Sequence, residues 1–158
     1  MPESYGVRDP RREATPLPWD WVVDRMSRAR SYWVATSRRD GAPHVVPVWG
    51  LWFEGGFCFF TDGTSQKSRN VQRDPRAAVH LESGDEVVVL EGKLDPETDL
   101  GTVDRAARAY ESKYEVDVAA GEDGPVMYRL THSRVLAWDE GDFPRTATRW
   151  RFGSPGPG

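Results

Sequence analysis

The first apolar pattern along the chain has helical spacing, and a strand-like pattern follows it. The helical positions are Trp19, Val22, Val23, Met26 and Ala29. Because residues three and four apart share one helix face, these positions predict a short amphipathic helix that covers the core. Residues 31–37 are rich in aromatic and β-branched side chains, which favours a strand. The Asp40-Gly41 turn after this segment predicts a hairpin with the next strand.

Strand-like and helical segments alternate along the rest of the chain. Further strands are expected at residues 44–53, 57–61, 77–81, 87–93, 126–130, 134–138 and 146–152. A short helix is expected from about Ser65 to Asp74, because the residue before Pro75 disfavours helical geometry. A longer helix with Asp99 as its cap is indicated by Leu100, Val103, Ala107, Tyr110 and Tyr114. About six to eight antiparallel strands with two or three helices predict an α+β, mainly β protein whose sheet closes into a small barrel.

The length of the chain fits one compact domain with a short extension at each end. A chain of 158 residues can build a single core that needs no disulfide or metal. Residues 1–15 are polar and contain proline, and we interpret them as a flexible arm. Residues 153–158 are rich in Gly and Pro and are interpreted as a disordered tail. The folded domain is therefore expected at residues 16–152.

Composition argues against several classes of function. The net charge of −4 disfavours a nucleic-acid binder that relies on bulk positive charge. No secretory signal and no membrane-spanning apolar run is visible, so we expect a cytoplasmic protein without a membrane partner. The single Cys and the three His residues lack metal-ligand spacing, so no metal site is expected. Cys58 lies among Phe residues and is expected to be an inert buried thiol.

The most informative polar segment runs from Thr61 to Asn70. Ser65 or the preceding Thr is a good helix N-cap, so the next backbone N–H groups lack intrahelical acceptors. Lys67 and Arg69 add two positive charges to this first turn, where the helix dipole disfavours cations. Hydroxyls, free N–H groups and cations at one helix start favour an anion site, and phosphate fits it best. The alternative is that both cations are solvated, or are neutralised by Asp62 and Asp74.

A second informative segment is the strand from His44 to Phe53. Both of its faces are apolar, through residues such as Trp49 and Trp52, whereas a half-buried strand would alternate. One interpretation is a strand that is buried on both sides or lies at a dimer interface. The other is a flat apolar wall for a tricyclic ring, with backbone groups freed at Pro47, where the strand should bulge or expose an edge.

No segment carries the signature of a catalytic acid, base or nucleophile. The chain contains no Gly-x-Ser-x-Gly elbow, and no Walker or Gly-x-Gly-x-x-Gly loop precedes a helix. The catalytic residues therefore stay unassigned at this stage.

Several segments, taken in order, resemble the split-barrel flavin and deazaflavin oxidoreductase superfamily, which includes the pyridoxamine 5′-phosphate oxidase-like proteins. The matching stretches lie at residues 33–36, 40–49, 60–61, 65–70, 74–76, 88–92 and 147–152. The resemblance covers about residues 19–152 and is strongest to the coenzyme F420-dependent branch. It implies a homodimer of six-stranded antiparallel split β-barrels, each with flanking helices, with the cofactor grooves at the subunit interface.

The resemblance also implies which residues bind the cofactor. They are His44, Pro47, Val48, Trp49, Phe60, Thr61, Ser65, Lys67, Arg69, Asn70 and Trp150. The segment that begins at Ser65 would hold the phosphate, and the strand that contains Pro47 would lie along the ring. Phe60 and Thr61 would form the groove floor, and Trp150 would reach toward the cofactor of the other subunit. The basic substrate-binding motif of true pyridoxamine phosphate oxidases is not matched near the C-terminus, which argues against pyridoxamine oxidation.

The expected cofactor is F420, with FMN as the alternative. Both have a tricyclic ring, a ribityl chain and a phosphate, but F420 adds a lactyl-oligoglutamate tail whose carboxylates need basic partners. Only three of the 21 basic residues are Lys, and the rest are Arg, which binds carboxylates in a bidentate manner. A basic path could be lined by Arg38, Arg39, Arg69, Arg149 and Arg151. A compositional bias accounts for the arginines equally well.

The expected function is F420-dependent transfer of hydride from the reduced cofactor to a small electron-poor organic substrate. Two alternatives stay open, an FMN-binding pyridoxamine 5′-phosphate oxidase-like protein and a non-catalytic protein that binds F420 or a flavin. The missing acid or base favours none of them, because in such reactions the cofactor supplies the difficult chemistry and the protein supplies binding and orientation.

Overall fold

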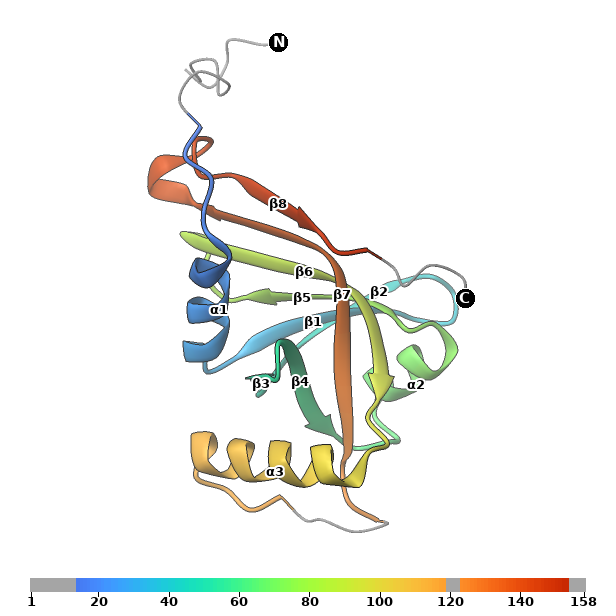
Figure 1. Ribbon diagram of the computed structural model, residues 1–158. Coiled ribbons are helices and arrows are strands. Elements are labelled where there is room, and N and C mark those ends of the chain that lie inside the picture. Colours follow the sequence, from blue (N-terminus) through green and yellow to red (C-terminus); the bar gives the residue numbers. More distant parts are fainter. Residues whose placement is uncertain (1–13, 119–122, 154–158) are drawn as a thin grey trace.

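The computed structural model describes residues 14–118 and 123–153, which form one strongly curled antiparallel sheet with helices around it (Figure 1). The strands are β1 (Tyr32–Ser37), β2 (Pro43–Val48), β3 (Leu51–Phe53), β4 (Gly56–Thr61), β5 (Arg76–Leu81), β6 (Glu86–Pro96), β7 (Val126–Asp139) and β8 (Thr148–Arg151). The helices are α1 (Trp19–Arg28), α2 (Gln66–Arg73), α3 (Leu100–Tyr114) and the short 3₁₀ turn η1 (Glu140–Asp142). The strand order is β2-β1-β5-β6-β7-β4-β3, and β8 pairs with β7.

The α+β, mainly β class is confirmed, and the eight strands fall within the six to eight that the sequence pattern predicts, but the six-stranded barrel that the resemblance implies has too few strands. Eight strands form the sheet, because the segment at residues 43–53 is divided into two strands and because β8 extends the sheet beyond β7. Among the described residues the edge strands β2 and β3 are not hydrogen-bonded to each other. The sheet is therefore a curled half-barrel, which matches a split barrel, and not a fully closed one.

The single strand expected at residues 44–53 is interrupted at Gly50. A Cβ atom on Gly50 would lie 2.4 Å from Cε2 of Phe57, so the backbone approaches this ring more closely than any other residue type allows. The Gly50 N–H donates to Tyr114 Oη at 2.9 Å, and Lys113 Nζ donates to the Gly50 carbonyl at 2.9 Å. Helix α3 thus holds the link at the point where the chain leaves β1 as its partner and joins β4.

Two strands expected at residues 126–130 and 134–138 are one continuous strand, β7. It pairs with β6 along its whole length, and the register shifts once, between Glu91 and Gly92. A Cβ atom on Gly92 would lie 2.1 Å from the Thr131 carbonyl oxygen, so only glycine fits at this bulge. The bulge bends the two strands without ending either, and this bend curls the sheet.

The main core lies between the concave side of the sheet and α1. Its largest fully buried side chains include Tyr32, Phe57, Phe59 and Tyr128. Helix α1 contributes Val22 and Met26, as its amphipathic pattern predicted. A smaller core under α3 contains Leu51, Cys58, Ala106 and Met127. In Figure 1, α3 crosses beneath β3 and β4, and α2 lies at the opposite end of the sheet from α1.

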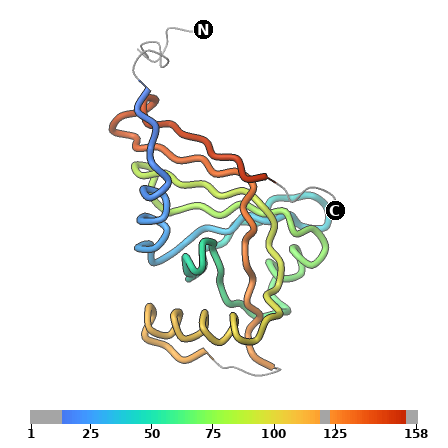
Figure 2. Tube along the Cα trace, viewed as in Figure 1, coloured from blue at the N-terminus to red at the C-terminus, as the bar shows by residue number. Residues whose placement is uncertain are grey.

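The first described residues run beside the connection between β7 and β8 at one end of the sheet (Figure 2). The Thr15 N–H donates to the Arg145 carbonyl, and the Leu17 N–H donates to Thr148 Oγ1, both at 2.9 Å. The predicted arm at residues 1–15 and tail at residues 153–158 lie almost entirely outside the described residues. Within the described ranges, no helix is long and apolar enough to cross a membrane.

Candidate functional site

A groove of about 370 Å³ opens beside the β2–β3 link and brings together residues from distant parts of the chain. Its lining residues are Ser31, Pro47, Val48, Trp49, Phe60, Thr61, Lys67 and Tyr110. Six of these eight belong to the cofactor-binding set expected from the sequence, and they come from β2, the link that follows it, the end of β4 and α2. Ser31 and Tyr110 are the two that sequence reasoning missed.

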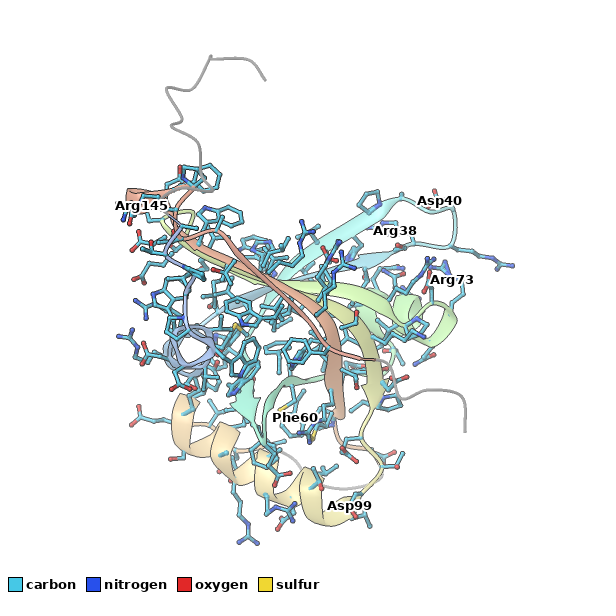
Figure 3. The ribbon with its side chains drawn as sticks, turned by 45° about the horizontal axis from the view of Figure 1, so that its top comes forward. Arg38, Asp40, Phe60, Arg73, Asp99 and Arg145 are labelled. Atoms are coloured by element: carbon cyan, nitrogen blue, oxygen red, sulfur yellow. The ribbon has the colours of Figure 1, made fainter. Side chains whose placement is uncertain are left out.

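One side of the groove is built from stacked aromatic rings. Trp49 is stacked on Tyr114 with ring centroids 4.7 Å apart and parallel planes, and Tyr114 lies 4.7 Å from Tyr110. Tyr110 then meets Phe60 edge-on at 5.4 Å. Phe60 lies beside α3 in Figure 3. Because Trp49 is still 38% exposed, it offers a flat apolar surface that a planar ligand ring can cover.

The other side of the groove is the N-terminus of α2. Ser65 is its N-cap, and Ser65 Oγ accepts from the Ser68 N–H and lies 3.5 Å from Thr61 Oγ1. The first turn contains no acidic residue, so the partial positive charge of this helix end is not neutralised from within. The cap prediction is confirmed. The backbone N–H groups of Gln66 and Lys67, in the first turn, have no carbonyl acceptor within the helix.

Lys67 is the charged residue of the groove. Its side chain is half-buried, and burial lowers its pKa below the usual lysine value, with the Asp62 carboxylate opposing the shift. Within the described ranges no hydrogen bond or ion pair holds its ammonium group. Asp62 accepts hydrogen bonds from Thr64, and Asp74 is paired with Arg76 at 2.7 Å. Neither carboxylate therefore forms an ion pair with Lys67 or Arg69 within the described ranges, although the charge of Asp62 partly compensates that of Lys67.

The neighbours of Lys67 on α2 do not join it in the groove. Arg69 is exposed and donates to Gln66 Oε1 at 3.0 Å. Its side chain points away from that of Lys67, because residues two apart on a helix point to nearly opposite sides. Asn70 is buried, and its Nδ2 donates to Thr36 Oγ1 at 3.0 Å. Asn70 thus ties α2 to β1 and does not line the groove. The expected convergence of Lys67 and Arg69 on one point is not found within the single chain.

His44 and Trp150 also lie outside the groove lining. His44 is half-buried at the start of β2, and burial, followed by the charges of Arg38 and Lys67, lowers its pKa. Arg38 lies at the connection between β1 and β2 (Figure 3). Trp150 packs edge-on against Trp19 with centroids 5.4 Å apart. Trp150 therefore belongs to the α1 end of the same chain, and a role toward a second subunit stays a prediction.

The strand β2 is not buried on both sides within one chain. Pro43, Val45 and Pro47 are exposed on one face, and the residues between them are half-buried. Pro47 pairs only with β1, because β2 is an edge strand, as the missing N–H of proline predicted. The prediction for Cys58 is confirmed, since it is buried and burial raises its pKa to about 12.

A larger, shallow depression of about 1020 Å³ lies on the outer face of the sheet. Small residues of β1 and β5 such as Ala35, Ala77 and Ala78 line it, together with His132 and Phe152. None of the residues expected to bind the cofactor lines this depression. The smaller groove is therefore the candidate site, because it combines a flat apolar wall with a half-buried cation that has no ion-pair partner within the described ranges.

Comparison with known proteins places the chain in a family. Residues 20–140 match the pyridoxamine 5′-phosphate oxidase family (PNPOx_N). Among solved structures, a conserved hypothetical protein from Mycobacterium tuberculosis superposes with a TM-score of 0.70 at 24% identity, over 81% of this chain and 88% of that one. A comparison with curated proteins gives no significant match.

Two further solved structures share the fold at lower identity. An F420 reductase superposes with a TM-score of 0.57 at 20% identity, over 71% of this chain and 93% of that one. A heme binding protein from Mycobacterium smegmatis superposes with a TM-score of 0.60 at 22% identity, over 78% of this chain and 53% of that one. With the family match spanning most of the chain and the half-barrel sheet shared by these structures, the protein belongs to the pyridoxamine 5′-phosphate oxidase family.

Proposed function

We propose that the chain binds F420 in this groove and transfers hydride from the reduced cofactor to a small electron-poor organic substrate. The observation that carries the proposal is the position of Lys67, a half-buried cation at a helix N-terminus opposite the Trp49 wall. A ligand with a planar ring at one end and a phosphate at the other satisfies both features.

The residues present fit the phosphate end of such a cofactor. The amides of Gln66 and Lys67 and the Lys67 ammonium are donors, and the hydroxyls of Thr61 and Ser65 lie beside them. Moving a lysine into a half-buried site lowers its pKa and is unfavourable without a partner, so an incoming phosphate would relieve this cost. We therefore assign the phosphate to Lys67 and the ring to the segment Pro47-Val48-Trp49.

When bound and reduced, F420 supplies a hydride from ring position 5. Trp49 and Val48 would orient the ring by covering one face, and the aromatic wall would keep water from that face. Tyr110 is the phenol that lines the groove, and burial raises its pKa, so it stays protonated at neutral pH. Tyr110 Oη can thus hold a proton for the carbon next to the one that receives the hydride, with solvent as the other source.

The F420 reductase among the structural neighbours supports F420 as the first choice of cofactor. FMN has the same ring and phosphate arrangement and remains the alternative that the family name favours. A cytoplasmic location belongs to the same proposal, because the reaction needs a supply of reduced cofactor.

The proposal includes a homodimer with the groove at its interface. The exposed face of β2 supports it: Val45 is 49% exposed, and it pairs with Ala35, which lines the shallow depression on the outer sheet face. Pro43 borders the same depression, and Pro47 borders the groove. One continuous apolar strip therefore joins the depression to the groove, and a second copy that covers the strip would complete the groove wall.

A turnover assay tests the proposal. Reduced F420 is mixed with the protein and a panel of enones, imines and nitroaromatics, and oxidation is followed at the visible absorbance of the cofactor. Oxidation that depends on both protein and acceptor is expected. Tight binding of F420 without oxidation across the panel would favour the non-catalytic binding protein. Binding of FMN in preference to F420 would assign the flavin instead.

A further inference from the structure

A second cleft shares one lining residue with the candidate groove and is rich in arginine. It has a volume of about 460 Å³ and is lined by Arg25, Arg28, Ala29, Arg30, Ser31, Leu81, Glu82, Ser83 and Glu86. Ser31 lines both this cleft and the groove, so the two spaces adjoin at the end of α1. The arginine cleft is therefore next to the groove at Ser31.

Two of the three arginines in the cleft already have carboxylate partners. Arg25 contacts Glu86 at 2.8 Å and Asp24 at 3.3 Å, and Arg28 contacts Asp24 at 2.6 Å. Arg30 differs, because its guanidinium group has no hydrogen-bond or ion-pair partner within residues 14–118 and 123–153. It is therefore the arginine of this cleft that is available for an anionic ligand.

The guanidinium group of Arg30 is held over the aromatic wall. It lies 5.2 Å from the centroid of the Trp49 ring and 5.8 Å from that of Tyr114. The backbone is fixed as well, because Tyr114 Oη lies 2.8 Å from the Arg30 carbonyl oxygen. Within the described ranges no group accepts a hydrogen bond from this guanidinium, so its N–H edge can bind a carboxylate through two parallel hydrogen bonds.

Arg30 and Lys67 line different spaces. Lys67 lines the groove, whereas Arg30 lines the arginine cleft and lies over Trp49, directly after the end of β2. If the phosphate of the cofactor lies at Lys67, its glutamate tail, which is attached to the phosphate, leaves from that end.

We propose that Arg30 is a specificity-determining residue that binds a carboxylate of the substrate, and that the preferred acceptors are therefore small electron-poor carboxylic acids. The inference rests on the proposed function, because it takes the ring of F420 to lie against Trp49. The substrate carboxylate would lie against the Arg30 edge, and the electron-poor bond would lie over the ring.

Equilibrium binding to the protein saturated with oxidised F420 tests this assignment without turnover. The probes are two matched pairs, 4-nitrobenzoate with 4-nitrobenzamide and trans-cinnamate with trans-cinnamamide, measured by calorimetry. The wild type should bind each carboxylate about tenfold or more tightly than its amide, as expected for a charged hydrogen-bonded pair. Arg30→Gln should reduce this preference to within about threefold, and Arg30→Lys should keep part of it.

Arg108→Gln is the matched control, because Arg108 is an exposed arginine on α3 that is paired with Asp104. This variant should keep the full carboxylate preference. Equal binding of acid and amide by the wild type, or an unchanged preference in Arg30→Gln, overturns the assignment while F420 binding stands. If Arg30→Gln instead weakens F420 itself, the anion is the cofactor tail and the assignment is wrong. If the wild type does not bind F420, the proposed function fails first.

Discussion

Lys113 is a half-buried ammonium group behind the groove wall. Its Nζ donates to Tyr32 Oη at 3.0 Å and to the Gly50 carbonyl at 2.9 Å. Within the part of the chain that the structure describes, no carboxylate is paired with it. Burial lowers its pKa to about 8, with Arg30 adding to the shift and Cys58 opposing it. The protonated form is therefore less favourable in the folded protein than in the unfolded chain.

The stability of the wild type relative to Lys113→Met should consequently depend on pH. Between about pH 8 and pH 10 the unfolded chain still binds the proton that the folded chain has lost, so raising the pH favours the folded wild type. We expect the free energy of unfolding of the wild type, relative to that of Lys113→Met, to increase by about 1 kcal/mol between pH 7 and pH 10. The increase is modest because solvent screens a half-exposed group. Urea denaturation at pH 7 and pH 10 measures it.

A second variant isolates the effect of Lys113 from other titrations. Lys93→Met removes an exposed lysine on β6 and gives the baseline for losing one positive charge. Comparison between variants at each pH cancels the titration of groups that do not interact with Lys113, such as Tyr110, whose raised pKa lowers the stability of the folded state in alkali. A stability difference between wild type and Lys113→Met that is flat from pH 7 to pH 10 would contradict the assigned pKa.

At the scale of elements, α2 and α3 begin with matched caps that have different consequences for the site. Ser65 Oγ accepts from the Ser68 N–H, and Asp99 Oδ2 accepts from the Thr102 N–H at 2.8 Å. Ser65→Ala and Asp99→Ala should each lower the free energy of unfolding by about 1 kcal/mol. In addition, Ser65→Ala should weaken F420 binding severalfold, because the start of α2 forms one side of the groove.

Asp99→Ala is the internal control, because Asp99 caps α3 and does not line the groove. Fluorescence titration with F420 and urea denaturation of the same samples separate binding from stability. Equal loss of F420 affinity in both variants would mean that the helix start at Ser65 has no direct role in the groove.

The helices were predictable because their signals are local. Both caps, the α1 face and the end of α2 at Pro75 follow from residues within a few positions of each element. The division of β2 from β3 was not predictable. It depends on Gly50 meeting Phe57 and on Lys113 and Tyr114, which are more than 60 residues away in the chain.

The same limit applies to the candidate site. The β2 and α2 segments were recognisable, because each carries its pattern within ten residues. Tyr110 was assigned only to a helix face, and its place in the groove follows from how α3 packs against β3 and β4. Arg69 was placed beside Lys67 from spacing in the sequence, whereas the helical rotation separates the two side chains.

At the scale of the whole molecule, the exposed strip on β2 determines how copies of the chain would meet. We expect light scattering to give the molar mass of two chains for the wild type. Val45→Asp should lower this mass toward that of one chain, because the substitution places a charge on the strip. F420 affinity should fall with the dimer if the groove lies at the interface.

Leu100→Asp provides the comparison for this variant. Leu100 is 82% exposed at the start of α3, far from the β2 strip, so this variant should stay dimeric. A wild type that is monomeric at every concentration tested would contradict the proposed dimer. The groove would then be formed by a single chain.

The central claim is that Lys67 and the start of α2 hold the phosphate of F420. Its most direct test is a fluorescence titration of F420 into the wild type, Lys67→Ala and the exposed-lysine control Lys93→Ala. We predict that Lys67→Ala weakens binding by about 1–3 kcal/mol, the range for a charged hydrogen bond, and that Lys93→Ala matches the wild type. The same affinity for F420 in Lys67→Ala and the wild type would contradict the claim.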